Sequence, residues 1–82
     1  MTMTVEKRRN ARHRVLKGGT IEFGGAAIDC TIRNLSPSGA AIEVENQTGI
    51  PDHFTLVVPG DGLHMPCHVA WRRALRLGLT FD

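Results

Sequence analysis

The sequence predicts a single all-β domain of 82 residues, a small six-stranded antiparallel β-barrel. Six short segments alternate apolar and polar residues with a period of two, the pattern of a strand with one buried face. Most Gly and Pro residues lie between these segments, and no stretch of about 10–15 residues has the apolar spacing of a helix. A barrel is favoured over a sandwich because closure removes the exposed strand edges of a thin core.

The first three predicted strands are residues 20–23, 27–34 and 40–45. The first ends at Gly24-Gly25, and glycine pairs favour a tight turn because glycine adopts positive φ without steric cost. Residues 36–39 (SPSG) separate the second strand from the third and form a run of turn-forming residue types. We therefore expect two antiparallel hairpins in the first half of the chain.

The last three predicted strands are residues 53–58, 63–71 and 76–81, preceded by a loop over 46–52. Residues 59–62 (PGDG) give a strong turn signal between the first two of them. Pro66 has no N–H to donate to a neighbouring strand, so the strand that contains it is expected to lie at an edge or to carry a bulge there. The alternation in all six strands puts the following residues on the inner face: Ile21, Phe23, Ile28, Cys30, Ile32, Ala40, Ile42, Val44, Phe54, Leu56, Val58, Leu63, Met65, Cys67, Val69, Trp71, Leu77, Leu79 and Phe81.

The charge is distributed unevenly along the chain. Residues 1–17 contain six basic side chains and one acid, a local charge of +5, whereas residues 18–82 carry −3. Residues 1–13 lack sustained apolar periodicity, so we expect a flexible basic arm, followed by a barrel over residues 14–82. A basic arm usually implies an anionic partner, and the alternative is a solvated, disordered tail.

Several function classes are disfavoured. No apolar run approaches the roughly 18–20 residues of a membrane-spanning helix, and the N-terminal stretch has no apolar core typical of a secretory signal, so we expect a cytoplasmic protein. Cys30 and Cys67 are expected to be free thiols in the core. Ser36 and Ser38 have no evident base, and Glu43 and Glu45 lie on an outward strand face, so no catalytic residues and no enzyme activity are predicted.

The histidines raise the question of a zinc site. His64 and His68 share the outward face of one predicted strand, while Cys67 between them points inward. A tetrahedral zinc site needs ligands that converge on one point. Together with His53, these residues are therefore interpreted as surface histidines and a core thiol, and no metal and no cofactor are expected.

Arg8 and Arg12 form an R-x-x-x-R motif in the arm, with Arg9 between them. In an extended chain, four residues span roughly 13 Å, so two guanidinium groups on flexible stems could hold opposite sides of a small dianionic ligand. Bidentate arginine–phosphate pairs are strong, charge-assisted hydrogen bonds. Any basic tail can supply this spacing by chance, so the motif gains meaning only beside a second one.

The second motif is Asn34-x-Ser36-x-x-Gly39, which lies between two predicted strands. Asn and Ser side chains can bond to the backbone of their own turn, and Gly39 can adopt positive φ or allow a close backbone approach. Taken alone, these residues are equally typical of a tight hairpin.

The two motifs together, in a six-stranded β pattern, resemble the PilZ domain family. Residues 69–72 (VAWR) and 77–81 (LGLTF) look like the closing strands of that family, so the resemblance covers roughly residues 6–82. It implies a bacterial receptor that binds the second messenger cyclic di-GMP, with signalling through arm ordering to a protein partner. On the matching positions, it implies that the ligand contacts are Arg8, Arg9, Arg12, Asn34, Ser36 and Gly39. Asn34 stands where Asp is also common, so its bond to a guanine should be weaker.

Two alternatives and two further features stay open. The chain could be a PilZ-like interaction module that does not bind nucleotide, or a small barrel that binds single-stranded nucleic acid through its basic arm. Nucleic-acid binders of that kind expose aromatic rings for stacking, and all four aromatic residues here are predicted to point inward. Trp71 is interpreted as a core residue, with a wall near the ligand as the alternative. A second basic cluster, Arg72, Arg73 and Arg76, is interpreted as a solvated turn or a secondary phosphate contact.

Overall fold

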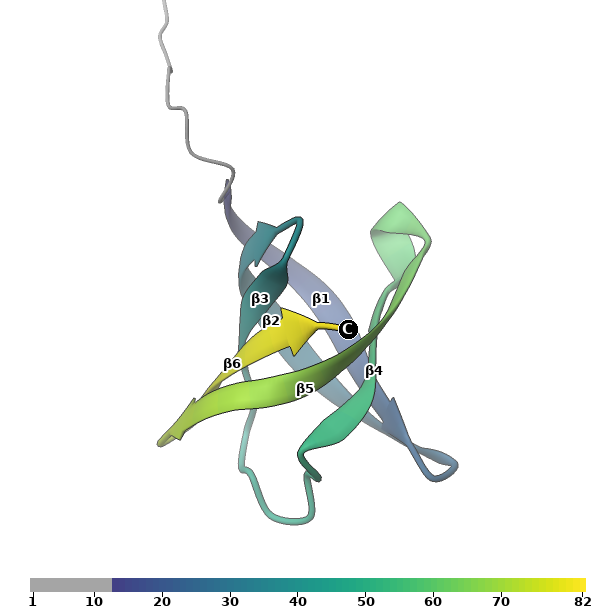
Figure 1. Ribbon diagram of the computed structural model, residues 1–82, viewed down its shortest axis with the longest axis vertical. Coiled ribbons are helices and arrows are strands. Elements are labelled where there is room, and N and C mark those ends of the chain that lie inside the picture. Colours follow the sequence, from purple (N-terminus) through teal and green to yellow (C-terminus); the bar gives the residue numbers. More distant parts are fainter. Residues whose placement is uncertain (1–12) are drawn as a thin grey trace, which may run out of the picture.

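Six antiparallel strands close into a barrel in the order β1-β2-β3-β6-β5-β4 (Figure 1). The computed structural model describes residues 13–82, and side chains from Leu16 onward. The predicted fold class is confirmed. The strands are β1 (His13–Phe23), β2 (Ala26–Ser36), β3 (Gly39–Glu43), β4 (His53–Val58), β5 (Leu63–Arg73) and β6 (Arg76–Phe81), with a short 3-10 helix, η2 (Pro59–Asp61), between β4 and β5.

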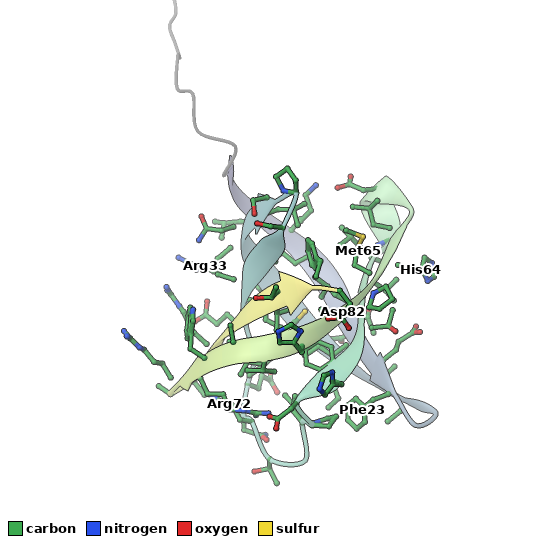
Figure 2. The ribbon with its side chains drawn as sticks, in the orientation of Figure 1. Phe23, Arg33, His64, Met65, Arg72 and Asp82 are labelled. Carbon is green, nitrogen blue, oxygen red and sulfur yellow. The ribbon has the colours of Figure 1, made fainter. Side chains whose placement is uncertain are left out.

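The core is the apolar inner face of the six strands. Ile21, Ile32, Ile42, Leu56 and Leu77 are fully enclosed, each from a different strand, and the remaining core residues pack around them. Successive side chains point to opposite faces of each strand, as His64 and Met65 of β5 show (Figure 2). This alternation is why a period of two in the sequence was sufficient to predict most of the core.

The barrel closes through a short seam between β1 and β4. On one side, β1 pairs with β2 from His13 to Phe23, but on the other side only Thr20, Ile21 and Glu22 pair with β4. By contrast, β4 pairs with β5 along its whole length. The seam is therefore the shortest strand pairing of the described barrel.

β1 is longer than the sequence predicted. Its predicted extent was 20–23, whereas the strand begins at His13. Two features explain why the alternation of apolar and polar residues does not reveal the first half of this strand. Gly18 and Gly19 interrupt the apolar pattern, and a register shift between Arg14 and Lys17 breaks the alternation itself. Long-range pairing with β2 supplies the order that the local sequence does not.

The expectation for Pro66 was wrong. β5 is paired on both sides, so it is no edge strand, and its register shift lies between Val69 and Trp71. Pro66 lies opposite Thr55 of β4, but the carbonyl of Pro66 points away from β4 and accepts a hydrogen bond from Asp82 N at 2.9 Å. β6 ends at Phe81, so Asp82, which lies opposite Pro66, is already outside the strand. The absent N–H of Pro66 therefore removes no hydrogen bond from the paired part of β6.

Candidate ligand-binding surface

The turn between β2 and β3 is held by its own serine. Ser36 Oγ accepts a hydrogen bond from Gly39 N at 3.2 Å and donates to Gly39 O at 3.2 Å. Ser38 Oγ lies 3.4 Å from Ser36 Oγ, and Phe81 N donates to Ser38 O at 2.9 Å, which ties the turn to the end of β6. The tight hairpin that the sequence indicates for this motif is thus confirmed.

Position 39 needs a glycine because a neighbouring strand lies close to it, and not because its φ angle is positive. The glycines with positive φ in residues 13–82 are Gly24, Gly25, Gly49 and Gly62, so the positive φ considered for Gly39 does not occur. Gly39 is buried, and a Cβ atom there would overlap the carbonyl oxygen of Leu79 on β6. The glycine of the motif therefore lets β3 and β6 approach closely beside the turn.

Four strands contribute to one straight row of cross-strand partners on the outer surface. Asn34 of β2 pairs with Ala41 of β3, Ala41 pairs with Gly78 of β6, and Gly78 pairs with Trp71 of β5. We call this set (Asn34, Ala41, Gly78 and Trp71) the outer row. On the other side of β2, Asn34 pairs with the Arg14 position of β1. The row is outward-facing because the flanking partners Ile42 and Leu77 are fully buried.

Each end of the outer row lies next to an irregularity in its strand. The register shifts fall between Ile32 and Asn34 in β2, and between Val69 and Trp71 in β5. A bulge inserts one unpaired residue, which reverses the side to which the following side chain points. Asn34 is paired with outward-facing Ala41 for this reason, and Trp71 with Gly78. Bulges are frequent beside binding sites because they redirect side chains.

Trp71 lies on the outer surface, so its predicted place in the core is wrong. The side chain is 44% exposed, and its indole covers Gly78, where any Cβ atom would overlap the ring. The guanidinium of Arg73 lies 5.6 Å from the ring centroid, within range of a cation–π contact. The prediction was wrong because of the bulge at Ala70, which the alternation of apolar and polar residues in the sequence does not reveal. The signal that was available is Gly78, a residue without a side chain in an otherwise apolar strand.

The arm residues Arg8, Arg9 and Arg12 lie outside the described residues. The structure does show where the arm joins the barrel. His13 pairs with Leu35 and Arg14 with Asn34, so the chain enters β1 directly beside the second motif. The described part of the chain thus begins at His13, opposite Leu35 and next to the partner of Asn34.

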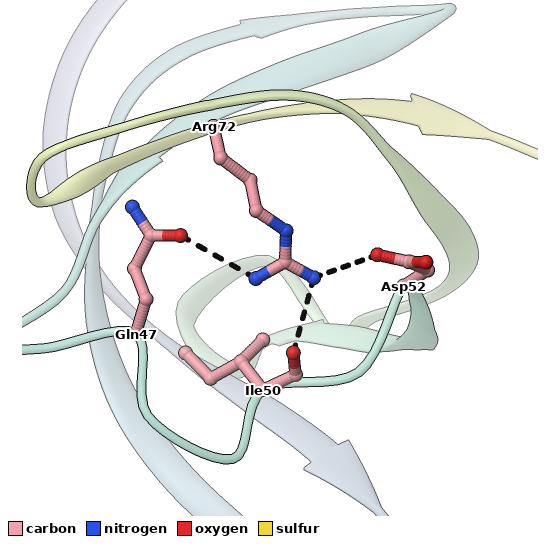
Figure 3. Close-up of polar contacts among 4 residues, drawn as sticks. All are labelled: Gln47, Ile50, Asp52 and Arg72. Atoms are coloured by element: carbon pink, nitrogen blue, oxygen red, sulfur yellow. Dashed lines mark hydrogen bonds and ion pairs between the residues drawn. The ribbon is translucent and has the colours of Figure 1, made fainter.

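The second basic cluster is divided between two roles. Arg72 closes the loop that joins β3 to β4: its Nη2 donates to Ile50 O at 3.0 Å and to Asp52 Oδ1 at 2.8 Å, and its Nη1 reaches Gln47 Oε1 at 3.4 Å (Figure 3). Arg72 is therefore a structural contact for this loop, whereas Arg73 and Arg76 are exposed at the β5–β6 turn.

Residues 13–82 contain no cluster of metal-ligating side chains. The His53 and His68 rings lie 5.7 Å apart, and His68 Nδ1 lies 2.8 Å from Asp82 Oδ1. Cys30 and Cys67 are buried free thiols, as predicted. Burial raises the pKa of each thiol to about 11, so both are protonated and weakly nucleophilic near neutral pH.

The comparisons with known proteins agree with the fold and the motifs. A family model described as the PilZ domain matches residues 6–82. No curated protein matches the chain. Within the described residues, no helix has the length and apolar character needed to cross a membrane. The match covers nearly the whole chain and both motifs, so the chain belongs to the PilZ domain family, whose members are binding modules for cyclic di-GMP.

Proposed function

We propose that this domain binds cyclic di-GMP on the outer surface of β2, β3, β6 and β5, and signals to a protein partner when its arm becomes ordered. The observation that carries the proposal is the outer row, which aligns Asn34 with an exposed Trp71 and lies beside the start of β1. The residues proposed to hold the ligand are Arg8, Arg9, Arg12, Asn34, Ser36 and Gly39, with Trp71 added by the structure.

The chemistry of the ligand matches these residue types. Cyclic di-GMP carries two phosphates and two guanines, and each guanine presents O6 and N7 acceptors that one arginine fork can contact together. Arg8, Arg9 and Arg12 supply the forks and the positive charge. The amide oxygen of Asn34 accepts a hydrogen bond from the donor edge of guanine. Ser36 and Gly39 hold the turn in place through their two mutual 3.2 Å bonds, so their role is to position the wall of the site.

The outer row supplies a platform for a flat base. The indole of Trp71 covers Gly78, and Ala41 carries only a methyl group, so no large side chain lies between the ring and Asn34. Neighbouring strands are about 4.8 Å apart, so a base stacked on the indole above Gly78 would lie within about two strand spacings of Asn34. Stacking of a base on an aromatic ring contributes about 1–3 kcal/mol.

Titration of the purified chain with cyclic di-GMP tests the proposal. Trp71 is the only tryptophan, so its emission reports directly on the outer row, and calorimetry gives the stoichiometry. We expect saturable binding with a change in Trp71 emission, and no such change with GTP. Heat without any change in emission would place the ligand elsewhere. A folded domain that binds no cyclic di-GMP would be an interaction module, and the proposal would fail.

The arm contacts are tested by substitution. Arg12→Ala removes a charge-assisted hydrogen bond, which contributes about 1.5–3 kcal/mol, so affinity should fall roughly 10- to 150-fold. Lys17→Ala is the control, since it also removes one positive charge, from a partly exposed side chain that pairs with Asp61. Equal losses in both variants would mean that the arm acts through net charge alone.

Single-stranded nucleic acid is a second candidate ligand, because the structure exposes the ring of Trp71 with Arg73 beside it. Binders of this class use several stacked aromatic rings and depend steeply on salt. Phe54 is buried, and Phe23 and Phe81 pack against the core, so residues 13–82 offer a single exposed ring. A short oligonucleotide in the same titration separates the two candidates, since its binding should fall more steeply with salt than the binding of cyclic di-GMP, which has only two phosphates.

A further inference from the structure

The turn between β5 and β6 departs from the usual chemistry of a tight hairpin. Ala74 has a φ of 38°, a region that non-glycine residues seldom occupy, and Arg73 lies directly opposite Arg76 in the ladder. Like charges in facing positions destabilise a strand pair. The β1–β2 turn has the same length but uses Gly24 and Gly25. The β5–β6 turn therefore lacks the residue types that favour a two-residue hairpin.

This turn also exposes apolar surface. Leu75 at its tip is 45% exposed, and Ala74 is exposed beside it. The turn is held in place from the loop after β3, since Val44 N donates to Leu75 O at 2.8 Å and the Gln47 amide donates to Ala74 O. We call residues 73–76 the hairpin tip. It presents one leucine between two arginines on a fixed support.

A groove of about 700 Å³ lies directly against the hairpin tip. It forms because β3 ends at Glu43, whereas β2 continues back to Ala26 without a partner on that side. The groove, which we call the acidic groove, combines three carboxylates with an apolar lining that includes the tip leucine: Asp29, Glu43, Glu45, Ile28, Val44 and Leu75.

The charges that lack an ion pair within residues 16–82 gather at these two features. Glu43 pairs with Arg33 at 3.1 Å, and Lys17, Arg72 and His68 each have an acidic partner at 2.8 Å. Among the lysines and arginines of this part of the chain, those that remain are Arg73 and Arg76, both on the hairpin tip. The acids that remain are Glu22, Asp29 and Glu45, of which the last two line the acidic groove.

We propose that two copies of this chain associate about a twofold axis through the hairpin tip, each tip lying against the acidic groove of the other. The two features form one contiguous surface, because Leu75 belongs to the hairpin tip with its two arginines and also lines the groove that holds Asp29 and Glu45. A twofold rotation brings such a surface against its own complement, because each contact then occurs twice. An anionic partner such as nucleic acid or a lipid surface would meet Asp29 and Glu45 as repulsive neighbours, which favours the second copy.

Sedimentation equilibrium of the full chain tests the proposal, without nucleotide and at protein concentrations of about 10 µM to 1 mM, where weak interfaces are populated. The chain should associate to a dimer at low salt and less so at high salt. Arg73→Glu with Arg76→Glu should weaken association at least about tenfold, and Asp29→Lys with Glu45→Lys should do the same. Glu22→Lys is the matched control and should leave association unchanged, since Glu22 lies outside the groove.

Mixing distinguishes a charge-specific contact from damage to the fold. An equimolar mixture of the two reversed variants should form a heterodimer, because each then presents the charge that the other lost. Circular dichroism melting of each variant checks that the barrel is intact. The proposal is overturned if the natural chain is monomeric throughout this range, if the reversed variants associate as it does, or if the mixture stays monomeric.

Discussion

At the scale of single residues, the guanine contact proposed for Asn34 should be weaker than the contact that an aspartate would make at the same position. Asn34 lies at one end of the outer row beside the start of β1, and a neutral amide oxygen accepts a weaker bond than a carboxylate does. An aspartate there would face the donor edge of guanine with full charge. We therefore expect substitution at this position to change affinity without changing the fold.

We expect Asn34→Asp to tighten cyclic di-GMP binding by about 1 kcal/mol, roughly fivefold, because the hydrogen bond gains a charged acceptor. Calorimetric titration measures the change, with Asn34→Ala as the comparison that removes the acceptor. Weaker binding by the aspartate variant would show that Asn34 faces a phosphate rather than a guanine.

Gly39 should be intolerant of any side chain. A Cβ atom there overlaps the carbonyl oxygen of Leu79, which is backbone and cannot rotate away. We expect Gly39→Ala to lower the free energy of unfolding by about 2–4 kcal/mol in urea denaturation. Gly18→Ala in β1 is the matched control, because open space surrounds that position and its φ is negative, so this variant should be neutral or slightly more stable. Similar losses in both would remove the close approach of β3 and β6 as the cause.

The buried thiols make stability depend on pH in the alkaline range. Burial raises the pKa of Cys30 and Cys67 from 9.0 to about 11, so between these values the unfolded chain releases protons that the folded chain keeps. The thiols have no effect below about pH 9, and the free energy of unfolding then falls with rising pH until about pH 11. Urea denaturation across this range should show a flatter dependence in Cys30→Ala/Cys67→Ala, and an unchanged slope would contradict the assignment.

At the scale of elements, the sequence was informative wherever strands alternate regularly. Residues 53–58 and 76–81 were predicted with the bounds that β4 and β6 have in the structure. Irregular strands were predicted less well, because a bulge changes the alternation without a local signature. The start of β1 was missed for this reason, and so was the outward position of Trp71. Of the candidate site, the turn motif could be read directly, whereas the outer row depends on register between strands distant in sequence.

The loop between β3 and β4 should depend on Arg72, whose guanidinium reaches both Ile50 O and Asp52 Oδ1. We expect Arg72→Ala to lower the free energy of unfolding by about 1–2 kcal/mol, because the carbonyl of buried Ile50 loses its donor. Hydrogen exchange should accelerate at Val69 N, which donates to Asp52 O at the base of the loop. Arg76→Ala serves as control and should change stability by less than about 0.5 kcal/mol. Unaltered exchange in Arg72→Ala would mean that the loop is held by its other contacts.

At the scale of the whole molecule, ligand binding should appear as added stability, because a ligand that binds only the folded state shifts the unfolding equilibrium. At a cyclic di-GMP concentration 100 times the Kd, the gain is about 2.7 kcal/mol, which raises the Tm of a domain this small by roughly 10–20 °C. Differential scanning calorimetry with GTP as control measures it. Arg8→Ala/Arg12→Ala should melt as the natural chain does and show no rise, and a full rise in that variant would exclude the arm from the site.

The short seam has a mechanical consequence for the barrel. Every other pair of neighbouring strands is joined along most of its length, but β1 meets β4 only at Thr20, Ile21 and Glu22. A load applied at the start of β1, where the arm joins, is carried by β2 on one side and reaches β4 only at these three positions. Under such a load, the pairing between β1 and β4 should therefore break first, while the surface from β2 to β5 that carries the outer row keeps its shape.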